Sequence, residues 1–368
     1  MNKKLLIAIL IIFVCTLSFA RAFLGLIGII PWHYGYSDIF NSDRIDESLA
    51  KKIPYLERPV EYQPVIGFFI YIMWLLGKNL LGYAIYTWIF LTAITIITTL
   101  QLYELTGALN AKKKRLLWFF IFAPSLVFFG VYNWDIIVVM FTVLAINSFY
   151  KKQYTLASLF LGLGFNTKLF PILILPVMLL KTDYKQWFKI LAVFVLAFLV
   201  INSFFIINNF DVWKFTFTFH SSRQPNIDSY WHLLNLGTPA VNFLSFILIG
   251  LSYLLVIYFH KKYDFISLSF MAVLIFLIFN KIFSPQYMLW LLPFLVLIQP
   301  VKLLSFYLLE FANLGVFFTG LYRILDSWQY LLPISTALAI ARTIILVYFL
   351  VAAIIRFRLE PAPVENFE

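Results

Sequence analysis

Apolar runs separated by short polar segments recur along the chain from Leu5 to Ile355. About 20 consecutive apolar residues are enough for a helix to cross the hydrocarbon core of a bilayer. A shorter run, residues 64–77, ends at Lys78-Asn79 and is expected to lie on the outer surface or to insert halfway. The pattern predicts an all-α integral membrane protein with about twelve transmembrane helices, at residues 3–30, 83–103, 116–132, 135–150, 155–167, 170–181, 187–207, 241–259, 265–280, 287–301, 303–323 and 332–355.

Basic residues lie in small clusters between these runs, and such clusters stay on the cytoplasmic side of a membrane. Lys152 and Lys181 are both in such clusters, so an even number of crossings must separate them. This parity predicts two short helices that turn at Asn166-Thr167-Lys168, with Pro171 opening the second. Both termini are expected to be cytoplasmic. The clusters are Lys3-Lys4, residues 112–115, Lys151-Lys152, Lys181 with Lys185 and Lys189, Lys261-Lys262, Lys302, and Arg356 with Arg358.

The composition supports one membrane domain over residues 1–368, because 62% of the residues are hydrophobic and only 12% are charged. The net charge of +11 comes from the interhelical clusters, so it indicates topology and not nucleic-acid binding. The single cysteine, Cys15, excludes an intramolecular disulfide. Residues 3–20 resemble a signal peptide with Ala20-Arg21-Ala22 as a cleavage site, but the apolar run continues to Ile30 and predicts a retained helix.

The orientation places most of the remaining polar residues outside, in a first loop at 31–82 with juxtamembrane helices and a second loop at 208–240. Asp38 follows the first span closely and is positioned to act as a general base on an acceptor hydroxyl. The alternative is a solvated or capping aspartate. Asp43, Asp46 and Glu47 alternate with Arg44, Lys51 and Lys52, which indicates an exposed helix with charge pairs.

Three further charged residues lie near the outer ends of spans. Glu61 is expected either to bind an acceptor or to stabilise the start of the 64–77 helix. Asp135, in Asn133-Trp134-Asp135, is expected to cap the next helix or to contact substrate. Lys168 should lie below the outer surface, where an unpaired charge is costly, so it needs an anionic partner: Asp135 or a ligand phosphate.

Two other outer segments carry groups that suit a phosphate. His220 and Arg223 lie in the second loop, and the planar fork of arginine matches phosphate oxygens. Lys281 and Gln286 add a cation and an amide at a helix break, where the alternative is a capped turn. No glycine-rich phosphate loop, metal-binding histidine pair or nucleophile elbow is present in the sequence, so soluble nucleotide-sugar chemistry is unsupported.

These segments together resemble the GT-C superfamily of polytopic glycosyltransferases, and most closely family 87 and the GPI mannosyltransferase I-like group. The resemblance covers nearly the whole chain. Its carriers are Tyr36-Ser37-Asp38-Ile39, Pro54-Tyr55, Glu61-Tyr62-Gln63-Pro64, Asn133-Trp134-Asp135, Leu156 to Pro171, His220 with Arg223, and Phe283-Ser284-Pro285-Gln286-Tyr287. Relatives commonly have Glu-Tyr-Pro-Pro where this chain has Glu61-Tyr62-Gln63-Pro64.

The resemblance implies transfer of a hexose, typically mannose, from a polyprenyl-phosphate sugar to a lipid-linked or protein-linked acceptor on the extracytoplasmic face. It implies one-step inversion with Asp38 as the catalytic base and no metal or other cofactor. Arg223, His220, Lys168 and Lys281 would bind the donor phosphate. Tyr36, Glu61, Tyr62, Asp135 and Gln286 would contact the acceptor. The partners would be the donor, a glycolipid or glycan acceptor and membrane lipids.

Two other classes of protein fit parts of the pattern. A polytopic transporter or flippase for a lipid-linked or anionic substrate would also have many spans and buried charges, although the C-terminal half contains no second copy of the Asp38 loop. A catalytically silent subunit that binds a lipid-linked glycan is the third interpretation. The location expected for the enzyme is the plasma membrane, or the endoplasmic reticulum membrane in a eukaryote.

Overall fold

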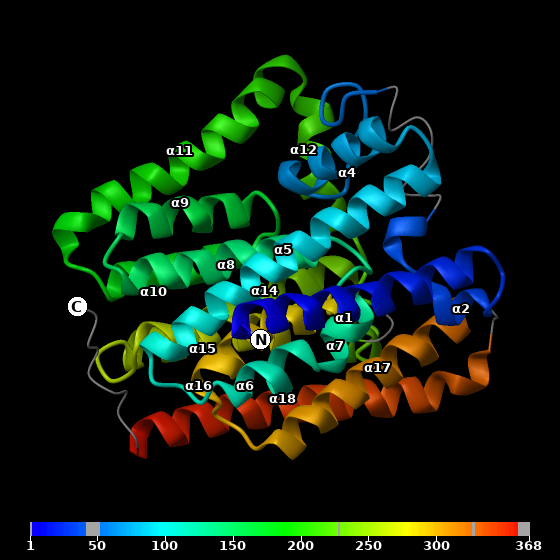
Figure 1. Cartoon of the computed structure of the whole chain (residues 1–368). Helices are drawn as coiled ribbons and strands as arrows, with labels where there is room; N and C mark the ends of the chain where they lie inside the picture. Colours follow the sequence, from blue (N-terminus) through cyan, green and yellow to red (C-terminus); the bar gives the residue numbers. More distant parts are fainter. Residues whose placement is uncertain (1, 42–51, 227–228, 326–327, 360–368) are drawn as a thin grey trace. The chain divides into compact units, whose positions relative to one another are not determined.

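The computed structural model of the chain describes residues 2–41, 52–226, 229–325 and 328–359 (Figure 1). These residues form helices joined by turns and loops, and the described ranges contain no strand beyond one isolated bridge between Pro54 and Arg58. The exposed helix expected around Asp43, Asp46 and Glu47 lies outside the described residues. The observed architecture agrees with the all-α class that the apolar pattern predicts.

The chain divides into two compact units that are interleaved in sequence. The first unit comprises Met1–Gln101, Phe128–Leu175 and Asp183–Arg223, and the second comprises Leu102–Val127, Pro176–Thr182 and Gln224–Glu368. The expectation of one membrane domain stays a prediction. Most of the polar residues singled out in the sequence belong to the first unit.

In the first unit, helices α8, α9 and α11 pack side by side (Figure 1). The N-terminal helix α1 packs against the short helix α2, which leads into the Asp38 segment. The elements that begin in this unit are α1 (Lys3–Leu26), α2 (Trp32–Gly35), η1 (Asp38–Phe40), α4 (Pro64–Gly77), α5 (Leu80–Ala108), α8 (Asp135–Tyr150), α9 (Tyr154–Phe165), η3 (Phe170–Leu173), α10 (Ile174–Leu180), α11 (Tyr184–Asn208) and α12 (Phe210–Ser222).

In the second unit, α17 and α18 lie along each other, and α15 packs against both α14 and α18 (Figure 1). The elements that begin in this unit are α6 (Lys114–Leu116), η2 (Leu117–Ile121), α7 (Pro124–Phe129), α13 (Tyr230–Leu233), α14 (Thr238–Phe259), α15 (Phe265–Phe279), η4 (Pro285–Trp290), α16 (Leu292–Ile298), α17 (Leu303–Leu325), η5 (Gln329–Leu331) and α18 (Leu332–Leu359).

Six helices among the described residues are long and apolar enough to cross a membrane: α1, α5, α11, α14, α17 and α18. They make the chain a multi-pass membrane protein. Six shorter apolar helical segments, each of 10–17 residues, accompany them. The total of about twelve spans depends on whether the shorter segments cross, so that number stays a prediction.

The helix expected at 116–132 is wrong as a continuous element. The chain instead forms the π-helical turn η2 and then restarts as α7 at Pro124. Proline has no N–H donor, and its ring clashes with the carbonyl four residues earlier, so an α-helix cannot run through this position unbroken. Composition alone did not reveal the break, because the residues on both sides are apolar.

The first helix also ends earlier than the apolar run, at Leu26 and not at Ile30. Gly28 adopts a left-handed conformation with φ of 76°. The N–H groups of Gly28 and Ile29 bond back to the carbonyls of Gly25 and Leu24, at 3.2 and 3.0 Å. This arrangement is a Schellman motif, which terminates the helix despite the apolar residues that follow.

The second outer loop expected at 208–240 contains the 13-residue helix α12. The Asn209 side chain caps this helix by accepting a hydrogen bond from the N–H of Val212 at 3.3 Å. His220 therefore lies in the last helical turn, and Arg223 is the C-cap residue. Both residues are placed by a helix and not by an irregular loop.

Candidate functional site

Asp38 is buried at the start of η1, with 3% of its surface exposed. The preceding Ser37 accepts a hydrogen bond from the N–H of Ile39 at 3.3 Å and donates its hydroxyl to the Tyr132 carbonyl at 2.7 Å. The Ile39 N–H also reaches the Tyr132 carbonyl, at 3.4 Å. The turn that carries Asp38 is thus bound to the turn that precedes α8, although about 95 residues separate them.

The Asp38 carboxylate has a tyrosine beside it. The hydroxyl of Tyr36 donates to Asp38 Oδ1 at 3.4 Å and accepts from Asn41 Nδ2 at 3.0 Å. The ring of Tyr36 lies 6.0 Å from the ring of Tyr132. A buried carboxylate beside a hydroxyl is suited to accept a proton from a substrate hydroxyl that displaces the tyrosine.

Arg21 supports the same loop from helix α1. Its guanidinium donates to the backbone carbonyls of Tyr34 and Tyr36, the latter at 3.2 Å, and lies over the ring of Phe128 at 5.6 Å. The sequence drew attention to Arg21 only as part of a cleavage motif. Arg21 lies within the continuous helix α1, and its guanidinium bonds this helix to the backbone of Tyr36, two residues before Asp38.

Two glycines allow the loop to approach α1 closely. A side chain built on Gly35 would place its Cβ 2.3 Å from the Cα atom of Gly25, and one built on Gly25 would lie 2.5 Å from the Cα atom of Gly35. No β-carbon fits at either position without moving backbone. Glycine is therefore required on both sides of this contact.

Asp135 is the anionic partner of Lys168. Lys168 Nζ lies 3.6 Å from Asp135 Oδ1, and the Asp135 side chain is fully buried. Asp135 is the first residue of α8, and its N–H is bonded by the side chain of Asn133 at 3.0 Å. Asp135 thus lies at the start of α8, as the sequence predicts, and its carboxylate pairs with Lys168.

Tyr62 connects this ion pair to the first loop. Lys168 Nζ lies 5.1 Å from the centroid of the Tyr62 ring, which packs edge-on against Trp134 at 5.2 Å. The buried hydroxyl of Tyr55 donates to the Tyr62 carbonyl at 2.7 Å. Burial raises the pKa of Tyr55 well above its ordinary value, so this phenol remains a donor.

The helix that follows Glu61 begins at Pro64 with Gln63 as its N-cap residue. Glu61 therefore lies two residues before the N-cap, outside the first turn of α4. The stabilising effect of the helix dipole on a carboxylate is strongest within that first turn. The backbone N–H of Val65, in that first turn, bonds to the carbonyl of Asn166 at 3.0 Å. The start of α4 is thus joined to the turn that contains Lys168.

Helix α12 is held against the same segment. The Thr216 hydroxyl approaches the carbonyls of Val60 and Tyr62, at 2.8 and 3.2 Å. His220 is four residues further along and so lies on the same face of the helix. His220 therefore lies on the side of α12 that contacts the Tyr62 segment, and Arg223 lies at the end of the helix.

A chain of buried amides runs from the Lys168 turn to α12. The Asn202 side chain in α11 donates to the Asn166 side-chain oxygen and accepts from Trp213 Nε1 at 2.8 Å. Asn166 also donates to the Gly162 carbonyl at 2.8 Å. A polar residue within an apolar span requires such partners, because an unmade hydrogen bond there is costly.

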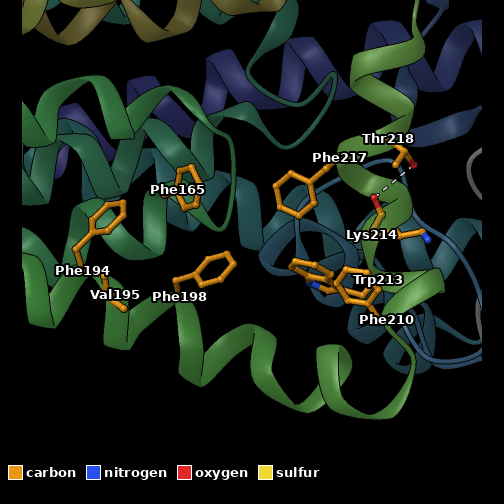
Figure 2. A pocket seen from close by; sticks show the side chains of 9 residues that line it. All are labelled: Phe165, Phe194, Val195, Phe198, Phe210, Trp213, Lys214, Phe217 and Thr218. Atoms are coloured by element: carbon orange, nitrogen blue, oxygen red, sulfur yellow. Dashed lines mark hydrogen bonds between the residues drawn. The ribbon is translucent and has the colours of Figure 1, made fainter.

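Trp213 also lines an aromatic pocket of about 550 Å³ in the first unit. Figure 2 shows the rings contributed by α9, α11 and α12 facing a common space. The hydroxyl of Thr218 on its wall donates to the carbonyls of Lys214 and Phe215, at 3.4 and 3.1 Å. The lining residues are Phe165, Phe194, Val195, Phe198, Phe210, Trp213, Lys214, Phe217 and Thr218.

The structure therefore groups most of the expected site residues in the first unit: Tyr36, Asp38, Glu61, Tyr62, Asp135, Lys168, His220 and Arg223. Lys281 and Gln286 belong to the second unit, where they are 6% and 8% exposed. Gln286 is part of η4, and the Lys281 carbonyl accepts from the N–H of Asn226 at 3.3 Å. The sequence missed the supporting roles of Arg21 and Asn202, because both lie inside apolar runs.

These features define a polytopic membrane protein with a buried acid and a group of cations at helix ends. The family model of glycosyltransferase family 87 matches residues 61–280, more than half of the chain. The chain belongs to glycosyltransferase family 87 and is a glycosyltransferase. The match does not distinguish the GPI mannosyltransferase I-like group. A comparison with curated proteins finds no significant match.

Proposed function

We propose that the protein transfers a hexose, mannose in the first instance, from a polyprenyl-phosphate sugar to a lipid-linked or protein-linked acceptor. The observation that carries the proposal is the placement of Asp38. This carboxylate is buried and adjoins a tyrosine hydroxyl, and the preceding Ser37 donates to the carbonyl of Tyr132, three residues before Asp135 of the Asp135–Lys168 pair. Family membership supplies the reaction class, and this arrangement supports the assignment of the base.

In the proposed reaction, the Asp38 carboxylate takes the proton of an acceptor hydroxyl as that oxygen attacks the anomeric carbon of the donor sugar. The bond from the anomeric carbon to the phosphate oxygen breaks, and the polyprenyl phosphate leaves with its electron pair. One displacement inverts the configuration at that carbon. Tyr36, Glu61, Tyr62, Asp135 and Gln286 are assigned to acceptor contacts.

The leaving phosphate requires positive charge, which interactions made in the transition state can supply. We assign Arg223 and His220 to this phosphate because they end a helix whose face contacts the Tyr62 segment. Lys168 adds a cation that Asp135 balances while no donor is bound. We also assign Lys281 to phosphate binding. The aromatic pocket lined by α9, α11 and α12 offers apolar surface for part of the lipid chain.

The decisive experiment incubates purified protein in detergent with a panel of polyprenyl-phosphate sugars and a lipid extract as acceptor. Transfer of the sugar from a polyprenyl-phosphate donor, with no transfer from nucleotide sugars, would support the proposal. Transfer from a nucleotide sugar alone would contradict it. Movement of the intact lipid-linked sugar across a proteoliposome membrane without sugar transfer would instead favour the flippase alternative.

A further inference from the structure

The second unit contains a buried arginine that the proposed mechanism does not use. Arg342 lies well inside α18, one of the candidate membrane spans, and is only 2% exposed. An ionisable side chain inside a membrane span is expensive and usually faces the protein interior, where it serves a function. The surroundings of Arg342 indicate what that function is.

Arg342 is linked to the break between α15 and η4 directly, through Phe283, and indirectly, through Asn313. Its guanidinium carbon lies 4.0 Å from the centroid of the Phe283 ring, the distance of a close cation–π contact. Its Nη1 donates to Asn313 Oδ1 at 3.0 Å, and Asn313 Nδ2 in turn donates to the Pro285 carbonyl at 2.8 Å. Asn313 is itself fully buried in α17.

The other end of the break has separate anchors. The carbonyl of Phe279, at the end of α15, accepts hydrogen bonds from Trp231 Nε1 at 3.0 Å and from the Ser245 hydroxyl at 2.7 Å. Residues 280–284 lie between these anchors and the carbonyl that Asn313 holds. Within that interval, the Arg342 guanidinium contacts the ring of Phe283, which is two residues after Lys281.

We infer that Arg342, acting through Phe283 and Asn313, is a positioning residue that fixes the 280–287 break and thereby sets the affinity for the sugar-phosphate donor. This inference rests on the proposed function, because Lys281 and Gln286 are assigned there to donor and acceptor contacts. The planar guanidinium is suited to the task, since it can stack on a ring and donate in its own plane at the same time. A lysine at position 342 would retain the charge but not this combination.

The first measurement does not depend on the donor. In a Cys15→Ala background, Ser284→Cys places a thiol in the break at a half-buried position, and its rate of reaction with a small maleimide reports how often the break opens. We expect Arg342→Lys and Asn313→Leu each to raise this rate about tenfold. Thr343→Val is the matched control, because that hydroxyl bonds to the Ala339 carbonyl of its own helix, at 2.9 Å.

The second measurement determines steady-state constants for Arg342→Lys with Ser284 intact. We expect the KM for the donor to rise about tenfold while kcat and the KM for the acceptor stay near wild type. A general loss of folding would instead lower kcat and the thermal unfolding midpoint together. Unchanged labelling would overturn the inference, and so would faster labelling with an unchanged donor KM. If the wild-type protein uses no polyprenyl-phosphate donor, the proposed function fails, and the labelling rates alone decide whether Arg342 fixes the break.

Discussion

Among single residues, Asp38 carries the proposed proton transfer. Removing the negative charge while keeping the shape, as in Asp38→Asn, should lower sugar transfer by a factor of at least about 10², the low end for loss of a general base. Donor binding should persist, because the proposed phosphate ligands are unchanged. Steady-state transfer and binding of a donor analogue test this together. Asp211→Asn is the control, since Asp211 is exposed and pairs with the neighbouring Lys214.

Wild-type turnover in Asp38→Asn would remove Asp38 from the mechanism, and a loss of equal size in Asp211→Asn would indicate a nonspecific effect. Asn at position 38 can still accept a hydrogen bond from Tyr36 through its carbonyl oxygen. A change in the fold is therefore not expected, and circular dichroism of the variant should match that of the wild type.

Arg21 offers a second test at this scale. Arg21→Lys preserves the charge but cannot reach two backbone carbonyls with one planar fork. We expect kcat to fall about tenfold, because the loop that carries Asp38 loses one of its supports, while the donor KM changes little. An increase in the donor KM at unchanged kcat would show instead that Arg21 acts on donor binding.

At the scale of elements, the Asn166–Asn202–Trp213 chain should stabilise the packing of α9, α11 and α12. Asn202→Leu leaves the Trp213 N–H and the Asn166 oxygen without their partner, at a cost of about 1–3 kcal/mol for each buried group. The thermal unfolding midpoint in detergent should fall clearly. Asn208→Leu, on the same helix but exposed and bonded to the Phe204 carbonyl of its own helix, should leave the midpoint nearly unchanged. Equal midpoints for the two variants would show that the amide chain contributes nothing.

The contact between α1 and the Asp38 loop is tested by Gly35→Ala, whose Cβ would meet the Cα atom of Gly25 at 2.3 Å. Because only backbone could move to make room, we expect a loss of stability of about 1–3 kcal/mol, the range for overpacking, together with a loss of transfer. Gly107→Ala is the matched control, because no atom lies within 4 Å of its Cβ. A stable and active Gly35→Ala variant would contradict the close approach of the two segments.

Element by element, the sequence predicted helices best where apolar composition and boundary signals agreed. Residues 135–150 form α8 with the predicted bounds, and 265–280 differs from α15 by one residue. The helix α12 was missed because Asp211, Lys214 and several hydroxyl residues lower its apolar content. The break before Pro124 was missed for the opposite reason, since apolar residues on both sides concealed it.

The same limit applies to the candidate site. Motif positions such as Asp38 and Asp135 could be singled out because charge is rare in this chain. Arg342 and Glu310 could not, since each lies alone within a long apolar run and its partner comes from a distant segment. Glu310 accepts a hydrogen bond from the N–H of Ser125 at 2.6 Å, in the first turn of α7. Such pairings depend on tertiary packing, which periodicity does not encode.

In the whole molecule, a shared active site requires that the Asp38 loop and the end of α12 face the same side of the membrane. Basic clusters predict that side to be extracytoplasmic, with Lys152 and Lys185 on the opposite side. The six long helices alone do not determine which side each loop faces. If the short helices α9 and α10 each cross the membrane, every later span keeps its predicted direction. If the two together cross only once, the direction of every later span is reversed.

The most direct test of this shared orientation is sided thiol labelling of single-cysteine variants in intact cells, all in a Cys15→Ala background. Four exposed positions serve as reporters: Lys52, Ser222, Lys152 and Lys185. Cysteines at positions 52 and 222 should react with a membrane-impermeant maleimide added outside. Cysteines at 152 and 185 should react only after the membrane is permeabilised. Labelling of positions 52 and 222 from opposite sides would separate Asp38 from His220 and Arg223 and would contradict a shared extracytoplasmic active site.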